Sequence, residues 1–118
     1  MTNEINRIDE QEEKRWHEFS YAFQIINIGT ELGHAMRYRR EHNREMMTEY
    51  LMRVYRQIAF TISDPKNSDK VTEVNRAEED VKKYFSSWRY WYLKKRIVNF
   101  FDSYIDEYVR VGMWKNEL

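Results

Sequence analysis

Only one proline and three glycines interrupt this chain of 118 residues. Proline and glycine are the strongest local terminators of helices and strands, and much of the remaining sequence consists of good helix formers such as glutamate, lysine, arginine and methionine. The sequence therefore predicts a few long helices and an all-α fold. A chain of this length buries roughly 60% or more of its unfolded surface, so we expect residues 1–118 to form a single helical domain.

The first helix is expected over about residues 4–38. Large apolar residues recur every three or four positions from Trp16 to Ile26, which is the spacing of one helix face. The pattern continues through Gly29 and Gly33, so we expect these glycines to lie inside the helix and to allow another backbone to approach closely. The opening third is strongly charged and is expected to protrude unless a partner covers it.

The second helix is expected over about residues 44–62, where apolar residues form one regular stripe. Residues 39–44 contain no apolar side chain and predict the turn before it. Residues 63–69 hold the only proline together with several turn-forming residues, and they predict the turn after it. Helices joined by such short turns pack as antiparallel neighbours.

The third helix is expected over about residues 71–111, with Gly112 in a left-handed position just after it. Segment 80–111 holds ten of the nineteen aromatic residues, so it is expected to form the centre of the fold. The apolar stripe of its first half lies more than a third of a turn away from the stripe of its second half. The buried face therefore changes between residues 88 and 96, and the absence of glycine and proline there favours a continuous helix over a break.

A continuous third helix has a consequence for assembly. Some 40 helical residues span about 60 Å, whereas a compact domain of this size has a radius of gyration near 13 Å. We therefore expect a bundle of three long helices that is completed by oligomerisation, or a four-helix bundle if the third helix kinks near residues 88–96.

The sharpest anomaly is segment 81–96, which carries a charge of +6 and no acidic residue. Its cations alternate with rings, and this pairing suits single-stranded nucleic acid or RNA, because cations neutralise phosphates and aromatic faces stack on bases. The simpler interpretation, which helical spacing favours, is that the rings are core and the charges are solvated. The cations are Lys82, Lys83, Arg89, Lys94, Lys95 and Arg96, and the rings are Tyr84, Phe85, Trp88, Tyr90, Trp91 and Tyr92.

Two other charged segments bear on this anomaly. Arg37, Arg39 and Arg40, together with Arg44, form a second basic run that would extend the surface if the first turn lies near the middle of the third helix. Residues 4–18 carry a net charge of −3 and are complementary to segment 81–96 of the same chain or of another copy.

The aromatic residues also indicate a protein–protein interface, because tyrosine and tryptophan are enriched at interface cores. We expect Trp88 to be buried, since it continues the upstream stripe, and Trp91 to contact a partner. Trp88 is also a candidate for such an interface, together with Tyr90, Tyr92 and Trp114.

No segment carries the pattern of a catalytic or cofactor site. The chain has no cysteine, which excludes disulfides, thiolate catalysis and cysteine-based metal sites. Glu31 and His34 have the Glu-x-x-His spacing of di-iron bundles, but no second such pair exists, so no metal is expected. The serines lack a nucleophile elbow and no glycine-rich phosphate loop is present. We therefore expect neither an enzyme nor a cofactor, and we infer no small-molecule substrate.

Charge and hydropathy place the protein in a broad class. The formal net charge is zero, and no run approaches the roughly 18 apolar residues needed to span a bilayer. The charged N-terminus lacks the apolar core of a signal peptide, so we expect a cytoplasmic protein that does not enter a membrane.

Two functional hypotheses follow. The first is a non-enzymatic interaction or assembly subunit that forms a homo-oligomer through its aromatic third helix. The alternative is a nucleic-acid-binding subunit of a nucleoprotein or viral assembly, which would use the basic and aromatic side chains of segment 81–96.

Overall fold

The computed structural model describes residues 2–110 and residue 112, with side chains described from residue 9 onward. The predicted interface residue Trp114 lies outside the described residues. All regular secondary structure in the described part of the chain is helical, which confirms the all-α prediction. The elements are α1 Thr2–His17, α2 Tyr21–Arg40, α3 Arg44–Ser63, α4 Val71–Ser86, α5 Leu93–Asp102 and α6 Ile105–Arg110, with two 3₁₀ helices, η1 Pro65–Lys70 and η2 Trp88–Tyr90.

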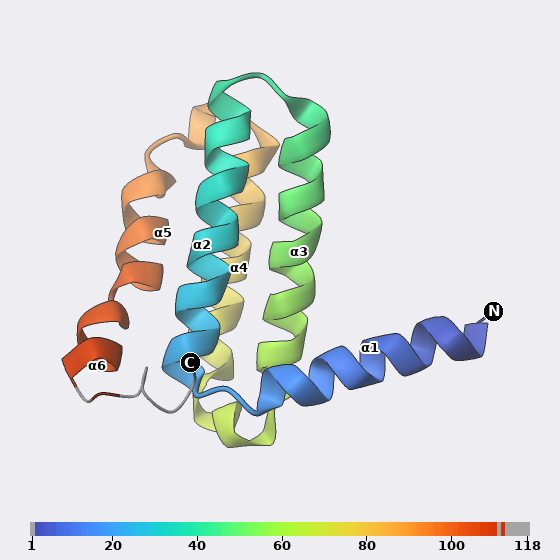
Figure 1. Ribbon diagram of the computed structural model, residues 1–118. Helices are drawn as coiled ribbons and strands as arrows, with labels where there is room; N and C mark the ends of the chain where they lie inside the picture. Colours follow the sequence, from blue (N-terminus) through green and yellow to red (C-terminus); the bar gives the residue numbers. More distant parts are fainter. Residues whose placement is uncertain (1, 111, 113–118) are drawn as a thin grey trace.

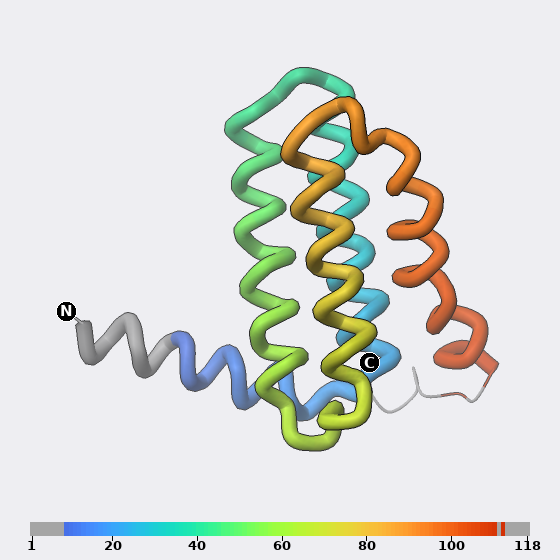
Figure 2. Tube along the Cα trace, turned by 180° about the vertical axis from the view of Figure 1, so that it is seen from behind, coloured from blue at the N-terminus to red at the C-terminus, as the bar shows by residue number. Residues whose placement is uncertain are grey.

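Helices α2, α3 and α4 stand side by side, and each runs antiparallel to the one before it (Figures 1 and 2). Helix α5 turns back and packs on α2 and α4. Helix α6 follows α5 and contacts the beginning of α2. Helix α1 runs sideways from the bundle at the end where α2 begins (Figure 1). The bundle therefore has a base end, where α1 meets it, and a turn end, where α2 joins α3 and α4 joins α5.

The predicted first helix is two helices. Helix α1 ends at His17 and α2 begins at Tyr21, because Ser20 acts as an N-cap whose hydroxyl accepts a hydrogen bond from the Phe23 amide at 3.2 Å. The apolar spacing runs through this break, so the sequence pattern did not reveal it. A serine in extended conformation is enough to start a new helix in a new direction.

Both interior glycines lie inside α2, as predicted, but only one permits a close approach. A Cβ atom at Gly29 would lie 3.0 Å from the Cβ of Phe101 on α5. A Cβ atom at Gly33 would meet nothing within 4 Å. The prediction of a close helix crossing is confirmed for Gly29 and is wrong for Gly33.

The second helix and its two flanking turns are confirmed. Helix α3 spans Arg44–Ser63. The turn before it includes His42 with φ +56°, and the turn after it begins at Asp64 and places Pro65 at the first position of η1. Proline is tolerated there because a first helical position has no amide partner to lose.

The prediction of one continuous third helix is wrong, and the alternative of a break near residues 88–96 is confirmed. Ser87 is extended, with φ −163° and ψ 145°, and ends α4. Its hydroxyl accepts a hydrogen bond from the Arg89 amide at 3.3 Å and so caps η2. The change of buried face in the sequence reflects this reversal. Further on, α6 leads to Gly112, whose φ of +76° confirms the predicted left-handed position.

The core lies between α2, α3, α4 and α5. Its fully buried aliphatic side chains come from all four helices, and the side chains of α5 complete it on the side that α3 leaves open. Burial of this apolar surface is the main force that holds the helices together. The largest of these aliphatic side chains are Ile25 and Ile28 of α2, Val54 and Ile58 of α3, Val81 of α4 and Ile97 of α5.

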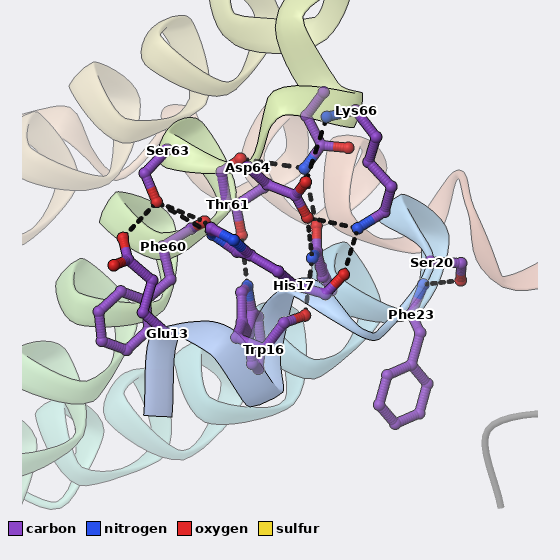
Figure 3. A network of polar contacts seen from close by, with 12 residues as sticks. Glu13, Trp16, His17, Ser20, Phe23, Phe60, Thr61, Ser63, Asp64 and Lys66 are labelled. Atoms are coloured by element: carbon purple, nitrogen blue, oxygen red, sulfur yellow. Dashed lines mark hydrogen bonds and ion pairs between the residues drawn. The ribbon is translucent and has the colours of Figure 1, made fainter. Parts of the chain in front are cut away.

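A buried polar network fixes α1 to the base end of the bundle (Figure 3). The Trp16 indole N–H donates to the Thr61 hydroxyl at 2.9 Å. The Gln24 amide donates to the Trp16 carbonyl at 2.9 Å and to Asp64 at 3.0 Å, and Asn67 donates to the Gln24 side chain at 2.8 Å. Residues from α1, α2, α3 and η1 therefore satisfy one another away from water.

Asp64 is the buried acid of this network, and its environment favours the charged form. Burial tends to raise the pKa of its carboxyl group, but hydrogen bonds from the Lys66 ammonium, the Gln24 amide and the Lys66 backbone outweigh burial and lower the pKa below its ordinary value. Asp64 therefore stays ionised while buried.

Candidate nucleic-acid interface

The turn end of the bundle exposes three large rings that lie close together in the sequence. Trp88 is 58% exposed, Trp91 is 70% exposed and Tyr92 is 57% exposed. They come from η2 and from the two residues that precede α5. Large aromatic side chains are usually buried inside a folded protein, so the exposure of three of them at one end of the bundle needs a physical reason.

The prediction that Trp88 is a core residue is wrong. The upstream apolar stripe does reach Tyr84, which is buried. Because Ser87 then leaves helical conformation, Trp88 no longer continues the stripe and turns outward. Trp91 is more exposed than Trp88, in the order that the sequence predicts.

The core interpretation of the aromatic segment is correct for some of its rings. Tyr84 is buried, and Phe85 and Tyr90 are partly buried and packed against the core. Tyr90 therefore stays a candidate for an interface only through the part of its ring that is exposed. Of the exposed rings, Trp88 is the one that the upstream stripe predicts to be buried.

The six cations of segment 81–96 divide into two groups. Arg96 binds Asp80 with two hydrogen bonds, at 2.6 and 2.8 Å, and these hydrogen bonds raise the pKa of Arg96. Lys82 lies 3.6 Å from Glu78. The other cations, which are Lys83, Arg89, Lys94 and Lys95, have no carboxylate within ion-pair distance in the described part of the chain.

Helical spacing brings two of these unpaired lysines beside Trp91. Lys94 and Lys95 follow it by three and four residues in the first turn of α5, and Val98 continues the same face. Together with Tyr92 and Asn99 they line a surface hollow of about 400 Å³. We call the set Trp88, Arg89, Trp91, Tyr92, Lys94 and Lys95 the basic–aromatic surface.

The sequence did not single out Asn99, although its amide lies in this hollow beside the rings and lysines. An amide both donates and accepts hydrogen bonds, so it can pair with the edge of a base. Its signal in the sequence was only its position, four residues after Lys95 on the same helix, and that signal has meaning only once α5 is known to begin at Leu93.

The fold brings the second basic run next to the basic–aromatic surface. The His42 and Trp88 ring centroids lie 6.4 Å apart. Arg37 and Arg40 are exposed, and the Arg37 guanidinium lies 4.6 Å from the Tyr38 ring centroid.

Arg39 is buried, although the sequence predicts it to be a contact residue for nucleic acid or another partner. Only 7% of it is exposed, and its guanidinium lies 4.1 Å from the Trp88 ring centroid and 4.3 Å from that of Tyr84. It donates to the Tyr84 carbonyl at 2.5 Å. This carbonyl belongs to the last turn of α4, where carbonyls lack partners within the helix, and so Arg39 ties α2 to α4.

Comparisons with protein-family models, with curated proteins and with solved structures each found no match to this chain. We therefore infer function from the chemistry of its surfaces.

The acidic N-terminal segment does not lie on the basic segment of its own chain. Its Asp9 and Glu12 bind Arg56 of α3, with the Glu12 contact at 2.8 Å. Helix α1 meets the bundle at the base end, far from η2 at the turn end (Figure 1). The prediction of pairing within one chain is therefore wrong, and pairing between copies stays a prediction.

Glu31 and His34, which have the spacing of a metal-binding pair, make separate contacts. The His34 ring centroid lies 4.9 Å from that of Tyr50 with the two rings tilted by 34°, and a Glu31 carboxylate oxygen lies 3.6 Å from the Arg53 guanidinium. No group of three histidine, aspartate or glutamate side chains is close enough in this part of the chain to hold a metal ion. None of the helices described combines the length and the apolar character needed to cross a membrane.

Proposed function

We propose that this chain is a non-enzymatic subunit that binds single-stranded nucleic acid through its basic–aromatic surface. One observation carries the proposal: three exposed rings stand among three cations, Arg89, Lys94 and Lys95, that no carboxylate of the described chain neutralises. Exposed rings stack on unpaired bases of any sequence, and unpaired cations bind the phosphates between them.

The same observation disfavours a symmetric contact between two copies. A two-fold interface places one patch against an identical patch. The unpaired cations of one copy would then face those of the other, and like charges brought together without counter-ions oppose association. A polyanion carries the complementary charge and also supplies planar groups.

Salt dependence tests the proposal directly. If about three phosphates are neutralised, the logarithm of the affinity for a single strand should fall with the logarithm of salt concentration with a slope of about −2. Fluorescence anisotropy with a labelled oligonucleotide would measure the slope. Lack of any binding at low salt would overturn the proposal.

A matched pair of variants locates the contact. Lys95→Gln removes an unpaired lysine that lines the hollow. Lys82→Gln removes a lysine of α4 that pairs with Glu78 and does not line the hollow. Both changes remove one positive charge from the protein. We expect Lys95→Gln to weaken binding and to reduce the salt slope by about 0.7, and Lys82→Gln to change both much less.

A second candidate function is head-to-tail self-association. The exposed acids Glu10 of α1 and Glu18 just after it have no ion pair in the described residues, and α1 lies at the opposite end of the bundle from the basic–aromatic surface. A contact between α1 of one copy and this surface of the next would pair opposite charges and would build rings or filaments. Such an oligomer would suit a nucleoprotein or viral assembly.

Light scattering separates the two candidates. Growth of the assembly with concentration, together with its loss in the Lys94→Gln/Lys95→Gln double variant, would support self-association. A monomer at micromolar concentration, with no nucleic acid present, would remove this second candidate and leave the first intact.

A further inference from the structure

A second hollow at the turn end adjoins the basic–aromatic surface and shares Trp88 with it. It has a volume of about 320 Å³ and lies between the end of α2, the start of α3 and the end of α4. We call it the end pocket. Its lining residues include Arg39, His42, Arg44, Ser87 and Trp88.

The end pocket contains a buried cation without a counter-ion. Arg39 has no carboxylate within ion-pair distance among the described residues, and its one hydrogen bond there goes to the Tyr84 carbonyl. A guanidinium has five N–H donors. No second hydrogen bond of this guanidinium is present among the described residues, and Arg39 is one of the residues that line the pocket.

The rim of the pocket adds further positive character. Arg44 is exposed, and no acid of the described chain pairs with it. It begins α3, whose first amide groups form the positive end of the helix dipole. Asn43 caps this helix by accepting from the Met46 amide at 3.1 Å, and the amides of Arg44 and Glu45 have no carbonyl partner inside the helix.

His42 occupies a backbone position that favours glycine. Helix α2 ends with hydrogen bonds from the Asn43 amide to the Tyr38 carbonyl at 2.9 Å and from the His42 amide to the Arg39 carbonyl at 3.1 Å. This is the Schellman pattern, in which the left-handed residue is usually glycine. A side chain there costs about 1–2 kcal/mol, yet it places an imidazole at the pocket rim opposite Trp88.

We propose that the end pocket holds the terminal phosphate of the bound strand. The inference rests on the proposed function, because Trp88 stands between the pocket and the rest of the basic–aromatic surface and would stack on the last base. A terminal phosphate monoester carries a charge of about −1.5 to −2 near neutral pH, whereas a phosphate within the strand carries one. Arg39 and Arg44 together match the doubly charged end.

Strands that differ only at their ends test this inference. Three short oligonucleotides of one sequence are compared by fluorescence anisotropy, one with a 5′-phosphate, one with a 3′-phosphate and one with neither. We expect one phosphorylated form to bind roughly tenfold more tightly than the unphosphorylated strand, as for a charge-assisted contact. The form that gains affinity also shows which end of the strand the pocket takes.

The variant Arg44→Gln should erase this preference, because Arg44 lines the pocket and makes no contact that the fold needs. Its control is Arg37→Gln, which removes an equally exposed arginine of α2 that does not line the pocket, and which should keep the preference. Arg39 is left unchanged in this test because its replacement would also remove the contact between α2 and α4.

Equal affinity for all three strands would overturn the inference while the proposed function stands. No affinity for any strand at low salt would overturn both. Binding of a free nucleoside monophosphate that Arg44→Gln abolishes, without binding of any strand, would assign the pocket to small nucleotides and would also overturn the assignment to a strand end.

Discussion

The two ends of the bundle treat polar groups in opposite ways. At the base end, Trp16, Gln24, Thr61 and Asn67 use one another as hydrogen-bond partners, and the buried Asp64 has Lys66 beside it. At the turn end, the partners of the buried Arg39 among the described residues are a carbonyl and aromatic faces, and several nearby cations have no acid beside them in this part of the chain. Polar groups that satisfy each other hold a fold together, whereas those left over are available to a ligand.

This contrast means that damage at the base end should change stability and damage at the turn end should change binding. The largest effect is expected for Gln24→Leu. The variant keeps the volume but leaves Asn67, Asp64 and the Trp16 carbonyl without their buried partner. We expect the free energy of unfolding to fall by about 3 kcal/mol or more, as measured by urea denaturation.

The control for this change is the binding of the folded protein. The affinity of Gln24→Leu for single strands, measured under conditions where it remains folded, should equal that of the unmodified chain. A loss of affinity without a loss of stability would contradict the division of roles between the two ends.

The next largest effect is expected for Trp91→Ala at the turn end. The ring is mostly exposed, so its removal should change the free energy of unfolding by about 0.5 kcal/mol or less. If it stacks on a base, binding to a single strand should weaken by about 1–3 kcal/mol. Trp16→Ala is the matched comparison, since it removes a buried tryptophan from the base end and should act on stability instead.

A gain in stability of about 1 kcal/mol is expected for His42→Gly, because glycine adopts the left-handed conformation of this residue without strain. Thermal unfolding would detect it. If the imidazole contributes to the end pocket, the more stable variant should bind a phosphorylated strand less tightly. A loss of stability would show instead that the ring of His42 supports Trp88.

The smallest and most gradual effect concerns pH. The folded-state pKa of Asp64 is lowered, so its contribution to stability is present above the unfolded pKa of about 3.9 and is lost as pH falls through the folded pKa. Unfolding measured from neutral to acidic pH should show this loss, and Asp64→Asn should show less of it. An unchanged pH dependence in the variant would exclude Asp64 as a source.

Much of the fold follows from the sequence, because its helices and turns have local causes. The stripe of α3 and the proline after it predict this helix to within a residue or two. The break at Ser20 was missed, and the break at Ser87 was only the less favoured alternative, because a serine hydroxyl can cap a helix or point into solvent and only the surrounding packing decides. The change of apolar face near residue 88 did mark the second break, but a continuous helix with two buried faces explained it equally well.

The candidate site was predicted only as a segment. Its charge and rings are visible in the sequence, but the split between paired and unpaired cations is not. Asp80 and Arg96 are sixteen residues apart and meet only because α5 reverses against α4. The same reversal determines that Trp88 is exposed while Tyr84, four residues earlier, is buried.

The contact between Gly29 and Phe101 has a consequence for how this sequence can vary. Helix α5 carries the lysines of the basic–aromatic surface, and a methyl group at position 29 would push it away from α2. Among descendants of a common ancestor, position 29 should therefore remain glycine, or change only together with position 101, while Gly33 should drift freely to alanine and other helix formers. Two glycines that look alike in the sequence would thus leave very different evolutionary records.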